Sequence, residues 1–203
     1  MRILSQWRNV FLRLMMAGAI SALTGCASMY VDGTTKEVPV AEYKAPAAAK
    51  PVQLVFEFQT KGVANDHATT FLKDRVMEQV KNSRMFSNVS DKPVEGGALL
   101  SVTLNNVPLS DDAFTKGFVT GLTFGLAGSQ VSDGYICTAK YSASPGGAAI
   151  SKQARHAIHT TVGAAATPAN ATKAANGEEA VTLMTRQILS NVLNDLSKDK
   201  DFK

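Results

Sequence analysis

The sequence is poor in aromatic residues, in cysteine and in net charge. Aromatic side chains make up 7% of its 203 residues, whereas 45% of the residues are hydrophobic and 19% are charged. These proportions are typical of one globular domain with some additional chain. They exclude collagen-like, strongly disordered and polytopic membrane proteins.

The formal charge of +4 arises mainly near the N-terminus. Arg2, Arg8 and Arg13 are the charged residues of the first 25 positions, and without them 18 of the 21 bases face 17 acids. Nucleic-acid binding needs a surplus of Lys and Arg, because these residues displace counterions from phosphates. We therefore expect no nucleic-acid partner.

Residues 1–25 have the pattern of a bacterial signal peptide. The three arginines precede an uncharged apolar run from Leu14 to Ala22, far shorter than the roughly 20 residues that span a bilayer as a helix. This pattern predicts a secretory signal rather than a permanent anchor. The next residues, Leu23-Thr24-Gly25-Cys26, closely resemble the lipobox of bacterial lipoproteins, in which small residues enter a protease site and the thiol accepts a diacylglyceryl group.

The lipobox resemblance implies that Cys26 begins the mature chain and carries a diacylglycerol and an N-acyl chain such as palmitate. Three acyl chains hold a protein at a membrane far more strongly than one chain does. In Gram-negative lipoproteins an Asp after the cysteine favours the inner membrane, whereas here Ala27 and Ser28 follow. The resemblance therefore implies an outer-membrane anchor that faces the periplasm. The alternative is that Cys26 is only a small apolar residue of the signal segment.

The second of the two cysteines, Cys137, has no intrachain partner if Cys26 is lipidated. Stability must then come from a hydrophobic core rather than from disulfides. Neighbours such as Tyr135 and Ile136 predict a strand, so we expect a buried and inert thiol. An intermolecular disulfide is the alternative.

Residues 26–51 predict a tether after the lipidated cysteine. They contain Pro39, Pro46 and Pro51 with several alanines, and they show neither helical nor strand periodicity. A flexible segment of this length reaches about 25 to 30 Å. The remaining residues, 52–203, would then form a periplasmic domain that stands off the bilayer.

Residues 52–203 show the periodicities of four strands and two helices. The element order βαβββα predicts an α+β, two-layer sandwich in which two helices cover one face of a four-stranded sheet. Residues 164–175, rich in alanine, predict a loop. Asn65 and Asp66 are the candidates to cap the first helix. The expected strands are 52–58, 99–107, 135–144 and 150–162, and the expected helices are 66–83 and 177–196.

The stretch from Val76 to Val89, which leads into a strand at Ala98, resembles small periplasmic lipoprotein domains. That group includes auxiliary lipoproteins of envelope transport systems, the curli secretion lipoprotein and the amino-terminal domain of the translocation protein TolB. In those domains a helix ends in a small-residue turn, followed by a Phe and a Val before a strand that crosses the sheet. The resemblance covers about a third of the chain and implies a fold rather than an activity.

Residues 113–132 are apolar and carry regularly spaced glycines. Glycines at spacings of four, four and three lie along one helical stripe, and large apolar residues lie along an adjoining stripe. Four glycines cost an isolated helix about 3 to 4 kcal/mol relative to alanine, so some contact must offset that cost. We therefore predict a glycine-rich apolar helix between the second and third strands. The candidate contact residues are Phe114, Gly117, Phe118, Gly121, Leu122, Gly125, Leu126 and Gly128.

Three alternatives remain for the contact that this glycine-spaced segment makes. The first is packing on the domain's own sheet, the second is association with another protein or a second copy, and the third is contact with the bilayer. Twenty nearly uncharged residues are just long enough to span a hydrocarbon core as a helix. The polar threonines, Ser129 and Gln130 weaken the hypothesis of a membrane span. The last two options predict an envelope protein that acts through this segment.

The sequence offers weak candidates for chemistry. His67, His156 and His159 do not make a metal site, because strand positions three apart point to opposite faces and zinc needs three or four converging ligands. Asp111 and Asp112 are better explained as the boundary of the apolar segment than as an acid-base pair. No nucleophile elbow, P-loop or dinucleotide fingerprint is present.

We therefore predict no cofactor beyond the acyl groups on Cys26, no metal site and no catalytic residue. The expected function is that of a non-enzymatic outer-membrane lipoprotein, an accessory or structural component of a cell-envelope assembly. The alternative is a periplasmic binding module that holds a small apolar or peptidoglycan-related ligand between sheet and helices. An enzyme ranks third.

Overall fold

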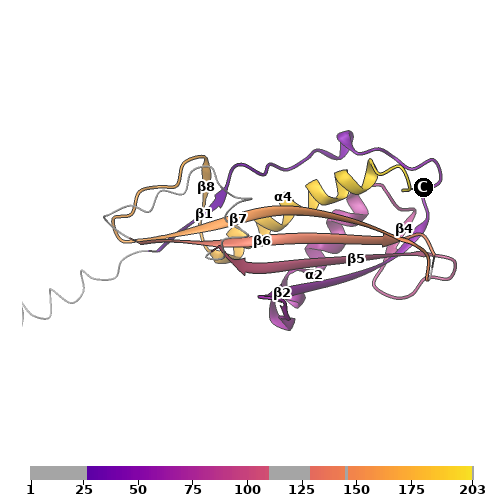
Figure 1. The fold of residues 1–203 in the computed structure, drawn as a ribbon, viewed down its shortest axis with the longest axis horizontal. Helices are drawn as coiled ribbons and strands as arrows, with labels where there is room; N and C mark the ends of the chain where they lie inside the picture. Colours follow the sequence, from indigo (N-terminus) through magenta and orange to yellow (C-terminus); the bar gives the residue numbers. More distant parts are fainter. Residues whose placement is uncertain (1–26, 110–128, 145, 203) are drawn as a thin grey trace, which may run out of the picture.

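The computed structural model describes residues 27–109, 129–144 and 146–202, and it contains a long twisted sheet with two helices packed along it (Figure 1). The lipobox cysteine Cys26 and all eight candidate contact residues from Phe114 to Gly128 lie outside these described residues.

The sheet has eight strands in the order β3-β2-β5-β6-β7-β1-β8, and β4 also pairs with β2. β2 pairs in parallel with β4 and β5, and the other pairs are antiparallel. The strands are β1 (Ser28–Asp32), β2 (Pro51–Thr60), β3 (Val63–Ala64), β4 (Asn88–Ser90), β5 (Ala98–Pro108), β6 (Ser129–Ser142), β7 (Ala149–Val162) and β8 (Ala171–Ala174).

The predicted four-stranded sheet of order βαβββα is therefore wrong. β2, β5, β6 and β7 lie where strands were expected, but four short strands join them. β1 and β8 have five and four residues and owe their conformation to pairing with chain far away in sequence. Such strands are too short to show the alternation of apolar and polar residues that predicts a strand, so the sequence pattern does not reveal them.

The predicted helix over 113–132 is also wrong at its C-terminal end. Ser129 to Ser132 begin β6 and pair in register with β7, Ser129 with Val162 and Ser132 with His159. The backbone of these residues pairs with β7, and the spacing of glycines and apolar residues in the sequence does not show such a pairing. The rest of the predicted helix lies outside the described residues.

The interpretation of 26–51 as a free tether fails as well. After β1, residues 33–50, here called the strap, run along the outer side of the C-terminal helix (Figure 1). Four hydrogen bonds join the strap to helix α4 (Gly177–Ser197). Three run from the strap to the helix, each 2.9 to 3.0 Å long: Val38 N–H to Ser190 Oγ, the Tyr43 hydroxyl to the Ser190 carbonyl, and Lys44 N–H to Ser197 Oγ. In the fourth, the Asn191 side-chain amide donates to the Lys36 carbonyl at 2.7 Å. A single turn of 3-10 helix, η2 (Val40–Glu42), lies within the strap.

Both helices begin at the residues that the sequence predicted, Asp66 and Gly177. Asn65 caps α2 (Asp66–Asn82) by accepting from the Ala68 N–H, and Asn176 caps α4 by accepting from the Glu179 N–H. Both helices lie on one face of the sheet, and the Gln79 amide of α2 donates to the Arg186 carbonyl of α4. Their buried apolar residues join those of the central strands in one core: Leu72, Val76, Val80, Met184, Ile188, Val192 and Leu196.

Candidate functional site

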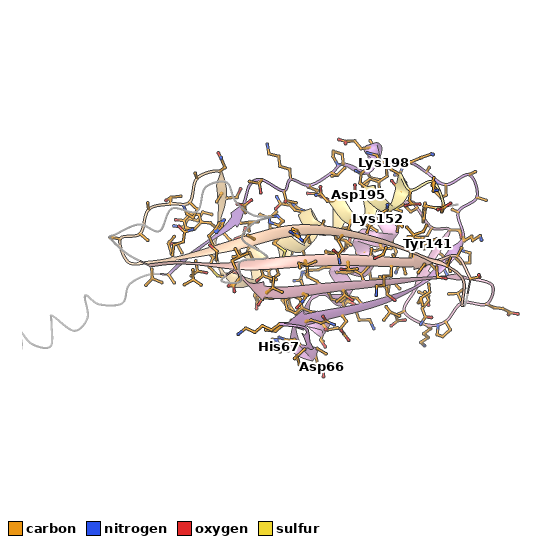
Figure 2. The ribbon with its side chains drawn as sticks, in the orientation of Figure 1. Asp66, His67, Tyr141, Lys152, Asp195 and Lys198 are labelled. Atoms are coloured by element: carbon orange, nitrogen blue, oxygen red, sulfur yellow. The ribbon has the colours of Figure 1, made fainter. Side chains whose placement is uncertain are left out.

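The three histidines do not converge. His67 is exposed on the first turn of α2, and in Figure 2 it lies beside Asp66, well away from Lys152 of β7. His156 and His159 are both buried on β7 and form hydrogen bonds with different partners. No group of three or more His, Cys, Asp or Glu side chains suited to a metal ion occurs within the described parts of the chain.

His156 points toward the helices. Its Nε2 atom lies 2.8 Å from Oε1 of Gln187 on α4, and its Nδ1 atom accepts from the Ala157 N–H. Burial lowers the pKa of His156 and outweighs the hydrogen bond to Gln187, which acts in the opposite direction. The ring is therefore neutral at pH 7 and serves to join β7 to α4.

His159 lies in a line of three polar side chains from three adjacent strands. The Ser132 Oγ atom of β6 is 2.7 Å from His159 Nδ1, and His159 Nε2 is 3.2 Å from Asp32 Oδ2 of β1. Burial opposes ionisation of Asp32, but the hydrogen bonds from His159 and Thr34 outweigh it and lower the pKa of Asp32 to about 2. The sequence did not predict this line, because Asp32 lies in the predicted tether and Ser132 in the predicted helix.

The order Ser132, His159, Asp32 invites comparison with a hydrolytic triad, but the setting differs. A catalytic serine is usually presented with hydrogen-bond donors aimed at a developing oxyanion. Ser132 instead lies inside a regular antiparallel pair, directly opposite His159. The His159 side chain is only 5% exposed. We therefore assign the line a structural role, in which it fastens β1 to the centre of the sheet.

Cys137 is buried on the core side of β6, as its strand neighbours predicted. Burial raises the pKa of its thiol to about 12. Because the thiolate is the reactive form, this cysteine is a poor nucleophile and a poor acceptor for modification.

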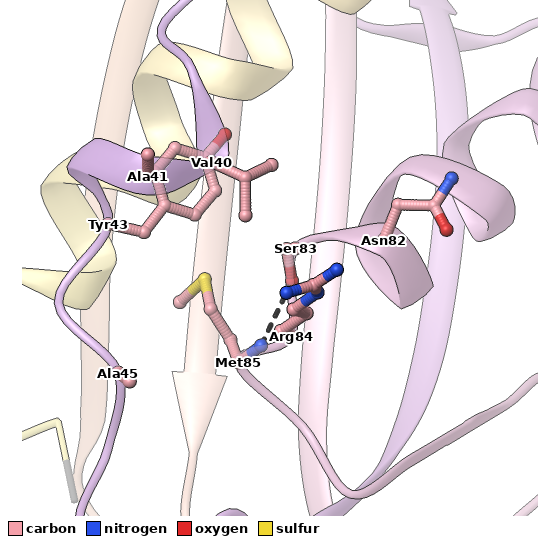
Figure 3. A pocket seen from close by; sticks show the side chains of 8 residues that line it. All are labelled: Val40, Ala41, Tyr43, Ala45, Asn82, Ser83, Arg84 and Met85. Atoms are coloured by element: carbon pink, nitrogen blue, oxygen red, sulfur yellow. Dashed lines mark hydrogen bonds between the residues drawn. The ribbon is translucent and has the colours of Figure 1, made fainter.

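A cavity of about 510 Å³ opens between the strap and the end of α2 (Figure 3). The strap contributes Val40 and Tyr43 to one wall, and Met85 faces them from the other. Its full lining is Val40, Ala41, Tyr43, Ala45, Asn82, Ser83, Arg84 and Met85.

A second cavity of about 400 Å³ continues the first between α2, α4 and the strap, sharing Val40, Tyr43 and Asn82 with it. We call the two together the strap groove. An ion pair of 2.8 Å between Arg186 Nε and Glu37 Oε2 bounds it, and both side chains are about half exposed. Such a pair contributes little to stability because solvent screens it.

The strap groove has the volume of a small-molecule site. Its lining mixes apolar, amide and charged side chains, so it suits a ligand with both polar and apolar parts. The groove lies on the outer side of the helices, whereas the alternative function predicted a ligand between sheet and helices. Thr185 also lines the second cavity, and its Oγ1 atom is buried and has no hydrogen-bond partner among the described residues.

Among the described residues, neither helix is long and apolar enough to cross a membrane. No protein-family model matches the chain, and no curated protein sequence does. The chain is weakly similar to solved structures that include a PelC dodecamer from Paraburkholderia phytofirmans and a variant of it, each with 12% sequence identity. They align with 84% of this chain and with 96% and 98% of theirs, at TM-scores of 0.35 and 0.34. A likeness at this level carries no argument about function.

Proposed function

We propose that this chain is a non-enzymatic outer-membrane lipoprotein that serves as an accessory or structural component of a cell-envelope assembly. The observation that carries the proposal is the order of arginines, apolar run and Leu23-Thr24-Gly25-Cys26 within the first 26 positions. Each part alone is common, but together they match the steps of export, cleavage and acylation.

The structure is consistent with this proposal in one further respect. Cys26 precedes the first strand residue, Ser28, by two positions, and β1 is fastened to β7 by its ladder and by the Asp32 to His159 contact. A lipid on Cys26 would therefore be joined to the sheet itself. Force or motion at the membrane would reach the core without a long flexible segment.

The two cysteines provide a matched test of acylation. We expect Cys26→Ser to give an uncleaved precursor that takes up no labelled fatty acid and leaves the outer-membrane fraction. Cys137→Ser changes a buried thiol that is closed to modification, so its product should be processed and labelled like the natural chain. Normal processing of the Cys26→Ser chain would refute the proposal.

The glycine-spaced segment remains our proposed contact for a protein partner or for a second copy. We expect Gly121→Leu with Gly125→Leu to change oligomer size or membrane fractionation, because bulky residues prevent close backbone approach. Val63→Leu, at a position that is 70% exposed on β3, is the control, because it also places a leucine at the surface. If the glycine variant behaves like this control, the contact role is lost.

A second candidate function is that of a periplasmic binding module, and the strap groove favours it. Native mass spectrometry of the purified chain would reveal a small molecule that copurifies. We expect Val40→Arg, at a position 39% exposed in the wall of the groove, to release such a ligand without unfolding the domain. A ligand-free natural chain would count against this candidate and leave the acylation test unaffected.

A further inference from the structure

Two strands, β1 and β6, begin at the same end of the sheet. β1 begins at Ser28, which pairs with Thr161 of β7, and β6 begins at Ser129, which pairs with Val162. In Figure 1 this end projects beyond the helices, opposite the C-terminus. We call it the anchor end and define it as residues 28–31, 129–132 and 160–172.

The anchor end exposes two large apolar side chains. Val131 is 58% exposed and Val162 is 40% exposed. Val131 pairs with Thr160, and strand residues two apart share a face, so the two valines lie on the same face of neighbouring strands. They therefore form one apolar patch at the tip of the β6–β7 pair and are not two separate exposed side chains.

The anchor end also carries no Asp, Glu, Lys or Arg. The first charged residues beyond its stretches are Asp32, Asp133 and Lys173. The longest of these stretches, from Thr160 to Thr172, runs for thirteen positions without a charged residue. Charge is costly to move into the apolar part of a membrane, so an uncharged end meets a lipid surface without that cost.

We infer that the anchor end is a membrane-contact surface, with Val131 and Val162 lying in the interfacial region of the bilayer. The inference rests on the proposed lipidation of Cys26. Two residues span at most about 7 Å, so the lipid holds the anchor end against the membrane surface. The domain therefore sits directly on the membrane instead of standing off on a tether.

The lipid provides the affinity, and the anchor end sets the orientation. Once acyl chains hold the chain at the surface, the valines meet the bilayer at a high effective concentration. Transfer of exposed apolar area from water into the interface is favourable. A second copy of the chain is the other occupant that an apolar tip would suit, and the test separates the two.

The test places a polarity-sensitive fluorophore on single cysteines in the full, lipidated chain. Val131→Cys and Val162→Cys report on the anchor end, and Leu99→Cys is the matched control, because Leu99 is 38% exposed and pairs with Ser142 at the opposite end of the sheet. Acylated Cys26 and buried Cys137 do not compete for the label. The intact mass of each preparation first establishes that the acyl groups are present.

The labelled chains are reconstituted in vesicles of phosphatidylethanolamine and phosphatidylglycerol. We expect the emission at positions 131 and 162 to shift to the blue and to be quenched by spin-labelled lipids, with neither change at position 99. Acylated chains whose three probes all behave as in water would overturn the inference and leave the lipoprotein proposal intact. Shielding at 131 and 162 that depends on protein concentration and not on spin-labelled lipid would show self-association and also overturn it.

Discussion

The two ends of the sheet are built in different ways. At the end near the C-terminus, Phe86, Tyr141 and Phe202 form a cluster in which the Tyr141 and Phe202 ring centroids are 4.9 Å apart and the Phe86 and Phe202 rings meet edge to face. The anchor end has exposed valines, and near it the strands are joined by the polar line of Ser132, His159 and Asp32. At the end near the C-terminus, here called the closed end, the aromatic side chains pack against one another. At the anchor end, apolar side chains are exposed to water.

This difference suggests a division of roles between the ends. Buried aromatic side chains contribute much of the stability of a small domain. Exposed apolar side chains contribute little to folding and mark a surface that meets something else. We therefore expect substitutions at the closed end to change stability, and substitutions at the anchor end to change attachment.

The largest expected effect is at the closed end. Phe202→Ala should lower the free energy of unfolding by about 3 kcal/mol, because it empties a site between two aromatic rings. Denaturant unfolding followed by circular dichroism measures it. Val162→Ala at the anchor end is the control, with an expected change within about 0.5 kcal/mol. Equal losses in the two variants would remove the contrast between the ends.

A smaller effect is expected where β1 joins the sheet. Asp32→Asn should cost about 1 kcal/mol, less than the pKa shift alone suggests because the Asp32 to His159 pair is partly exposed. Since folding lowers the pKa of Asp32, its contribution is present above pH 3.8 and is lost as the pH falls toward 2. Asp91→Asn, in an exposed pair with Lys73, is the control and should cost less. An Asp32→Asn chain with unchanged acid stability would contradict this role.

The buried histidine predicts a separate response to mild acid. Folding lowers the pKa of His156, so the unfolded chain binds more protons and stability falls as the pH drops below the ordinary histidine value of 6.5. The variant His156→Asn should flatten the pH dependence of the unfolding midpoint in this range. His67→Asn changes an exposed histidine on α2 and serves as the control. An unchanged slope in the His156→Asn chain would show that the histidine does not govern it.

The smallest effect on stability is expected at the exposed valines. Val131→Asp with Val162→Asp should leave the unfolding midpoint nearly unchanged, because both side chains are already exposed, Val131 to 58% and Val162 to 40%. Acylation should also proceed normally. A loss of stability as large as that of Phe202→Ala would mean that these valines belong to the core and not to a contact surface.

Local sequence patterns predicted the elements that carry their own signals. The Asn65 cap and the spacing of Leu72, Val76 and Val80 place α2 correctly, and the alternation of Val52 to Phe58 places β2. The burial of Cys137 followed from its strand neighbours. These features depend on contacts and periods within a single element.

The rest depends on pairing between distant segments. β1 has two adjacent buried residues, Tyr30 and Val31, and therefore lacks the alternation of a half-buried strand. Its strand conformation comes from β7 and β8, more than 125 positions away. The Asp32 to His159 contact arises from the same long-range pairing, and the strap groove arises from contacts between the strap and the two helices. No local period reveals either of them.

The intact mass of the native chain, extracted from the cell envelope with detergent, tests the central claim most directly. The account predicts a polypeptide that begins at Cys26 and carries a diacylglycerol and a third acyl chain on that residue. A cytosolic chain of 21.5 kDa that retains Met1 and bears no acyl mass would contradict the account.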